Sequence, residues 1–134
     1  PVMTAHETQA PASAGALPVM TSAEFRCLRE LLGLTTAWLA ARLGVAERTV
    51  QRWDHGHAPI PLGVAETIES LRDEADRQLD ALIEGMTAAT PLVTFRTDED
   101  AEAAGEVWPA SWHRALCGRA ADEVPGLRLI YWVP

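Results

Sequence analysis

The sequence contains no lysine and no asparagine, and all 11 of its basic residues are arginines, against 19 acidic residues. Its two cysteines, Cys27 and Cys117, are far apart and form no Cys-x-x-Cys pair, which argues against a disulfide framework and favours buried thiols in a reducing cytoplasm. No apolar run approaches the roughly 18 residues of a membrane-spanning helix. The N-terminus also does not have the basic-then-apolar order of a signal peptide. We therefore expect a cytoplasmic protein without membrane contact.

Sequence motifs for catalysis are also absent. No P-loop, dinucleotide-binding glycine motif, nucleophile elbow or HExxH occurs. His55 with His57, and His113 with Cys117, each lack the two further ligands of a structural zinc site, and favour a loop pair and a half-buried helix pair. The acids from Asp98 onward favour a stabilised helix N-terminus. We expect no metal, no cofactor and no enzymatic activity.

The formal net charge of −8 is unevenly distributed. Residues 58–104 carry a charge of −8 by themselves, whereas residues 21–57 hold five arginines against four acids. Phosphate contact depends on charge within a Debye length, roughly 8–10 Å, rather than on the sum over the chain. The acidic total therefore does not exclude a polyanion as a partner of residues 21–57.

Helical patterning begins at Thr21. Residues 1–20 contain three prolines and no apolar period, which predicts a disordered arm. Thr21 and Glu24 have the spacing of a capping box, and apolar residues follow at helical intervals until Gly33. A second helix is expected between Thr35 and Gly44, and a third over about 46–55 with Val50 and Trp53 facing inward.

A fourth helix is expected over 61–84, about 36 Å long at 1.5 Å per residue. Its apolar stripe recurs at spacings of three and four residues: Ile68, Leu71, Ala75, Leu79, Leu82 and Met86. The second half of the stripe needs a cover, either from the C-terminal region of the same chain or from a second copy. The opposite face is acidic and favours a solvated surface.

Beyond this helix the pattern changes to mixed α and β. "LVTFR" (92–96) predicts a strand, residues 98–104 a short helix, and Pro109 with Ser111 the start of a helix that carries Trp112. "GLRLIYWV" predicts a terminal strand. Two short strands do not make a stable sheet alone. They could pair with each other over the fourth helix, or complete a sheet across a dimer.

Residues 34–61, "LTTAWLAARLGVAERTVQRWDHGHAPIP", resemble the helix-turn-helix of Cro and phage-repressor-type regulators. Leu39 and Val50 would close the two helices on each other, and Gly44 would supply the positive φ of the tight turn. Trp53, Asp54 and Gly56 are similar to the W-E-x-G ending of that family, with aspartate in place of glutamate. Trp38 departs from the family pattern. It could pack on the first or fourth helix, or touch DNA backbone or a partner.

The resemblance implies double-stranded DNA as the partner. Arg48 and Arg52 would each bond to a guanine edge, Gln51 could read adenine, and Glu47 could accept from cytosine or orient Arg48. A solvated helix face is the alternative for the two arginines. Thr36 corresponds to a backbone phosphate contact. The DNA-binding residues expected are Thr36, Glu47, Arg48, Thr49, Gln51 and Arg52.

The C-terminal part also resembles a family of small phage and bacterial regulators that includes a type of anti-CRISPR-associated repressor. The whole chain is then mainly α, with a four-helix helix-turn-helix domain (21–70) whose long fourth helix leads into a small α+β dimerisation region (71–134). The dimerisation residues expected are Leu71, Ala75, Leu79, Leu82, Val93, Phe95 and Trp112. The resemblance implies a homodimeric autorepressor at an inverted repeat. An antitoxin that neutralises a toxin and autoregulates its operon is the alternative.

Overall fold

The computed structural model describes residues 17–87 and 89–134 and is mainly helical, as predicted. The remainder, including most of the arm expected over 1–20, lies outside the described residues. The elements are α2 (Ser22–Leu31), α3 (Thr36–Leu43), α4 (Glu47–Asp54), α5 (Leu62–Glu84), β1 (Leu92–Thr94), α6 (Asp98–Ala103), α7 (Ala110–Glu123) and β2 (Leu129–Tyr131).

The predicted helix starts and stops of the N-terminal half are confirmed. At Thr21 the hydroxyl accepts the backbone N–H of Glu24 at 3.1 Å, and the Glu24 carboxylate accepts the N–H of Thr21 at 2.8 Å. This capping box satisfies two amide groups that the first turn leaves without helical partners. The Thr35 hydroxyl caps α3 by accepting the backbone N–H of Trp38 at 3.0 Å, and Gly44 ends α3 at φ 71°. Met20 is also buried in the core, so ordered packing begins one residue before Thr21.

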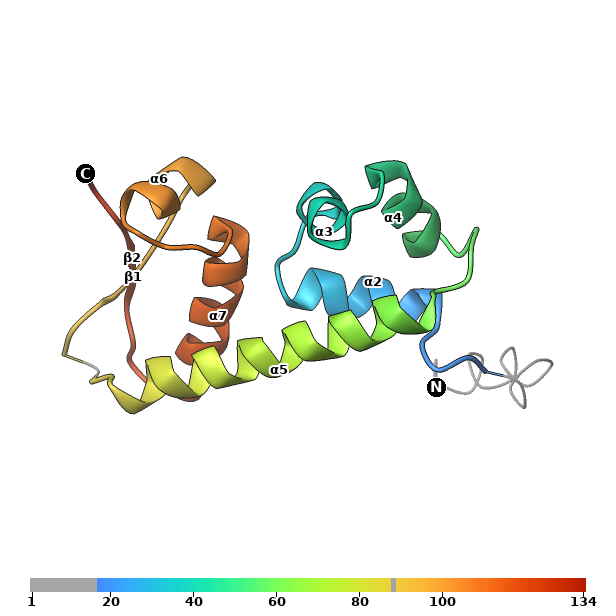
Figure 1. The fold of residues 1–134 in the computed structure, drawn as a ribbon. Helices are drawn as coiled ribbons and strands as arrows, with labels where there is room; N and C mark the ends of the chain where they lie inside the picture. The colour runs from blue at the N-terminus through green and yellow to red at the C-terminus, as the bar shows by residue number, and fades with distance from the viewer. Residues whose placement is uncertain (1–16, 88) are drawn as a thin grey trace.

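The long helix α5 lies along the base of the whole molecule (Figure 1). Its first half packs against α2 and its second half against α7. Leu71, Ala75 and Leu79 are buried in one hydrophobic cluster that also contains Trp112 and Leu116 of α7. The apolar stripe is therefore covered by the chain's own C-terminal region, which resolves the alternative that the sequence left open.

The two strands form a parallel pair in which Leu92 lies opposite Leu129 and Thr94 opposite Tyr131. A parallel pair requires a crossover, and α6 and α7 provide it. The strand predicted over 92–96 is shorter than expected, and the sheet packs on α7 rather than over α5. Asp98 of α6 accepts the N–H of Ala110 at 2.8 Å, which caps the start of α7.

The expectation of two buried thiols is wrong for one cysteine. Cys117 is buried on α7, whereas Cys27 is exposed on α2. The inward face of α2 carries Phe25 and Arg29, and Cys27 falls between them on the outer side. Cys27 is therefore a solvent-accessible free thiol.

Candidate nucleic-acid interface

α3 and α4 form the predicted pair of helices joined by a tight turn. Leu39, Ala40 and Val50 are buried where the two helices meet. Gly44 adopts the left-handed conformation that the turn needs and that a residue with a Cβ adopts at a cost. Trp53 is buried beside Phe25, at 5.8 Å between ring centroids in an edge-to-face contact. One side of α4 is thus fixed to the core and the other faces solvent.

The solvent side of α4 carries most of the residues predicted to contact DNA. Glu47, Arg48, Gln51 and Arg52 are exposed, and Thr49 is half-buried. Arg48 and the amide of Gln51 make no side-chain hydrogen bond or ion pair with the other described residues, so their donors and acceptors face solvent. The structure brings these predicted residues together on one face, and their role in binding DNA stays a prediction.

Thr36 and Glu47, from the starts of α3 and α4, are joined to each other. The Thr36 hydroxyl donates to the Glu47 carboxylate at 2.7 Å. This bond ties the two helix N-termini together and orients the Glu47 carboxylate. Thr36 therefore lies next to the exposed residues of α4, and its hydroxyl proton is directed at Glu47.

Two histidines extend this surface beyond what the sequence predicted. His55 and His57, which the sequence indicated only as a loop pair, lie 5.9 Å apart between ring centroids. With Arg48, Gln51 and Arg52 they line a shallow hollow of about 320 Å³. Arg52 donates to the His57 carbonyl at 3.3 Å, and the His55 ring bonds to the Gln51 carbonyl at 2.7 Å. The sequence could have indicated that His55 belongs to this surface, because Arg48, Arg52 and His55 recur at the spacing that places side chains on one helix face.

A buried ion pair anchors the end of α4 to α2. Arg29 donates to both carboxylate oxygens of Asp54, at 3.2 and 2.6 Å, and its remaining terminal nitrogen donates to the Leu34 carbonyl at 2.8 Å. Both side chains are almost fully buried, at 11% and 5% exposed. The bidentate geometry fixes α4 in direction as well as position. Asp54 is therefore part of the scaffold, at the position of the family's acidic residue.

Trp38 lies against the C-terminal region, which sequence reasoning did not anticipate. Its ring is 5.9 Å from that of Trp108, and Trp108 stacks on Trp112 at 4.3 Å with an interplanar angle of 15°. The expectation that Trp38 packs on the first or fourth helix missed this partner, which precedes α7 in sequence. A second link joins the same two regions, because the Ser111 hydroxyl donates to the Gly33 carbonyl. The helix-turn-helix is thus docked directly on the start of α7.

Most residues predicted for dimerisation are instead used within the single chain. Leu71, Ala75, Leu79, Phe95 and Trp112 are buried, and Leu82 is partly buried. The Trp112 indole N–H donates to Gln78 of α5 at 2.8 Å. A regular apolar stripe requires a cover, but its spacing does not identify the element that provides it. Of the predicted set, Val93 is the exposed one, at 38%.

The other histidine and cysteine pair lies inside the C-terminal region. His113 is half-buried, and its Nδ1 lies 2.8 Å from the Thr94 hydroxyl and 3.4 Å from Cys117 Sγ. Burial lowers the pKa of His113 and raises that of Cys117, so both groups favour their neutral forms. Within residues 17–87 and 89–134, no group of three or more His, Cys, Asp or Glu side chains is arranged to hold a metal ion. Likewise, none of the helices described is long and apolar enough to cross a membrane.

Comparison with known proteins agrees with this architecture. No curated protein matches the chain. A model of the Aca2/YdiL-like family matches residues 20–111, well over half of the chain, from the buried Met20 to the start of α7. The match includes the paired helices, the long α5 and the first strand, and ends before β2. The chain therefore belongs to the Aca2/YdiL-like family of anti-CRISPR-associated, helix-turn-helix DNA-binding regulators.

Proposed function

We propose that this protein is a homodimeric transcriptional repressor that binds an inverted repeat in double-stranded DNA and blocks a promoter by occupying it. It would act by binding alone, without catalysis, metal or cofactor. The observation that carries the proposal is the outer face of α4, where Arg48 and Gln51 are exposed and have no side-chain partner among the described residues. A helix whose inner face is fixed by Val50 and Trp53 can present such a face to the major groove.

The chemistry of this face suits base edges. The Arg48 guanidinium can donate two parallel bonds to O6 and N7 of a guanine, and the Gln51 amide can pair with N6 and N7 of an adenine. Arg52 would exchange its bond to the His57 carbonyl, at 3.3 Å, for a base or phosphate contact. Each bidentate contact discriminates against a wrong base by about 1–3 kcal/mol.

The acidic total of the chain is compatible with this function. In Figure 1, α2 lies between α4 and α5, so the base-reading helix and the acidic helix are on opposite sides of the N-terminal half. The outer face of α5 is exposed and carries four of the acids: Asp73, Asp76, Asp80 and Glu84. Because the reading face has arginines and no lysines, we expect a moderate salt dependence of DNA affinity.

The first test is the affinity of the protein for DNA tiled from its own upstream region, measured by fluorescence anisotropy at two salt concentrations. Arg48→Ala should weaken binding to the specific tile by about 1–3 kcal/mol, a factor of roughly 5 to 160, without unfolding the protein. Arg72→Ala is the matched control, since it removes the same charge from the exposed face of α5. Equal affinity of Arg48→Ala and Arg72→Ala for that tile would contradict the reading face.

We place the dimer interface on the sheet. β2 is a short edge strand, and the apolar side chains around it are exposed: Val93, Leu129, Ile130, Tyr131 and Val133. A two-stranded sheet is marginal by itself, and an exposed apolar edge favours pairing with another copy. An adjoining hollow of about 310 Å³ could receive a side chain from the partner. This surface lies at the far end of α5 from α4, so a dimer through it leaves the outer face of α4 uncovered in each copy.

Ile130→Glu should convert the dimer to a monomer in light scattering, because it places a charge in the middle of the proposed apolar contact. Ile130 is 49% exposed, so the change removes little of the monomer's own core. Val107→Glu, at a residue 87% exposed elsewhere in the C-terminal region, is the control and should remain dimeric. A wild-type chain that is monomeric at tens of micromolar would contradict the dimer. A second protein recovered in equal amount with that monomer would favour the antitoxin alternative.

A further inference from the structure

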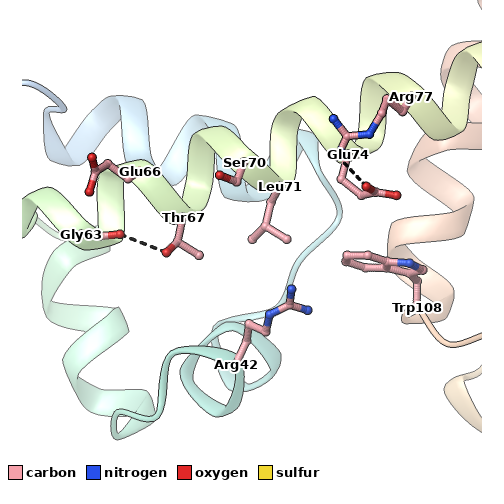
Figure 2. Close-up of a pocket in the computed structure, with 9 residues that line it drawn as sticks. All are labelled: Arg42, Gly63, Glu66, Thr67, Ser70, Leu71, Glu74, Arg77 and Trp108. Atoms are coloured by element: carbon pink, nitrogen blue, oxygen red, sulfur yellow. Dashed lines mark hydrogen bonds and ion pairs between the residues drawn. The ribbon is translucent and has the colours of Figure 1, made fainter.

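A cleft lies on the side of α5 that faces Arg42, next to the contact between the helix-turn-helix and the C-terminal region. Its volume is about 420 Å³. Figure 2 shows three walls: one long side from α5, one from Arg42 at the end of α3, and one from the indole of Trp108. The buried Leu71 contributes an apolar surface between them. The cleft is distinct from the outer face of α4 and shares none of its residues.

Arg42 provides an unusual cation in this cleft. Its guanidinium carbon lies 5.6 Å from the centroids of both Trp38 and Trp108. Two aromatic rings hold the group by cation–π attraction without using its N–H donors. Within the described residues no carboxylate lies within ion-pair distance of Arg42, and its side chain makes no hydrogen bond. Figure 2 shows the guanidinium directed between Leu71 and Trp108, so its donors face the space of the cleft.

Carboxylates line the opposite wall. Glu74 accepts hydrogen bonds from Gln78 at 2.9 Å and from Arg77 at 2.6 Å, and Arg77, its ion-pair partner, also lines the cleft. These bonds lower the pKa of Glu74, so the carboxylate stays charged. Glu66 lies further along the same face of α5 and is exposed. Neither acid is within 4 Å of the Arg42 nitrogens, so the cleft presents separated opposite charges with an apolar surface between them.

We propose that this cleft binds an α-amino acid with an apolar side chain. The carboxylate would pair with Arg42, the ammonium group with Glu74, and the side chain would lie on Leu71 and the Trp108 ring. A simple anion would pair with Arg42 but lie near the glutamates, and a simple cation would lie near Arg42 and Arg77. A zwitterion brings a carboxylate for Arg42 and an ammonium group for the glutamate, so that each charged side chain gains a charge-assisted hydrogen bond.

The test is thermal shift and tryptophan fluorescence of the full chain with L-phenylalanine, L-leucine and L-methionine. At least one should stabilise the protein saturably and change the emission of the Trp38–Trp108 pair. For the responding probe, deaminated and decarboxylated analogues are the matched ligands; for L-phenylalanine these are 3-phenylpropionate and 2-phenylethylamine. Both should bind at least tenfold more weakly, because each lacks one of the two charges.

Arg42→Gln should weaken the responding amino acid at least tenfold while the melting temperature of the free protein changes little, since Arg42 is exposed. Arg26→Gln, which removes an exposed arginine of α2, should leave binding unchanged. No saturable response to any of the three probes up to about 10 mM, well above a millimolar affinity, would overturn the proposal. So would equal binding of the matched analogues, or equal binding by the two variants. DNA affinity is not a readout here, so this outcome is independent of the proposed operator binding.

Discussion

Asp54→Ala is expected to lower the free energy of unfolding by about 3–5 kcal/mol, because it leaves the buried Arg29 guanidinium with only the more distant, exposed carboxylate of Glu30, at 3.8 Å. Arg29 donates to both carboxylate oxygens of Asp54 and to the Leu34 carbonyl. Alanine at position 54 has no acceptor, so the two bonds to Asp54 would be lost without replacement. The total stability of a domain is about 5–15 kcal/mol, so the loss is a large part of it. Urea unfolding followed by circular dichroism measures the difference.

The matched control is Asp80→Ala, which removes an exposed carboxylate from α5 and should change stability by about 0.5 kcal/mol or less. Arg29→Met with Asp54→Leu removes both charges together and should recover part of the loss, since no buried charge is left alone. With the single variants Arg29→Met and Asp54→Leu, this double variant completes a cycle whose coupling energy measures the interaction of the pair. If Asp54→Ala unfolds at the same urea concentration as Asp80→Ala, the ion pair does not anchor α4.

The N-terminal half could be predicted closely because its signals are local. Thr21 with Glu24, Thr35, and Gly44 are each read within a few residues, and the structure confirms all three caps. The inward face of α4 follows from helical spacing, and Val50 and Trp53 are buried as expected. The candidate reading face is then the remainder of that helix, which explains why its residues could be named in advance.

The contacts that position this half could not be predicted in the same way. Arg29 and Asp54 are 25 residues apart, and each taken alone is typical of a solvated helix face. Trp38 finds its partner in Trp108, on the far side of α5 in sequence. The apolar stripe of α5 predicted burial correctly but left open whether the chain's own C-terminal region or a second copy covers it, since spacing shows that a cover exists and not which element supplies it. Such pairings depend on the whole fold, which local patterns do not encode.

Gly33→Ala is expected to lower the free energy of unfolding by about 2–5 kcal/mol, from the sum of backbone strain and overpacking. Gly33 has φ +69°, a conformation that costs an L-residue about 1–2 kcal/mol. A Cβ there would also lie 2.2 Å from the Ser111 carbonyl oxygen and 2.8 Å from its carbon. Because both atoms belong to the backbone of α7, the clash can be relieved only by moving that helix.

Gly44→Ala separates the two causes. Gly44 has nearly the same φ, 71°, but a Cβ there would meet nothing within 4 Å, so this variant carries only the strain. The difference in stability between the two variants then measures how tightly α7 is docked on the helix-turn-helix. In Gly33→Ala we also expect red-shifted tryptophan emission, because displacement of α7 exposes the Trp108–Trp112 stack. Equal losses and equal emission in both variants would contradict that docking. A larger loss in Gly33→Ala alone would show that α7 packs tightly against the helix-turn-helix.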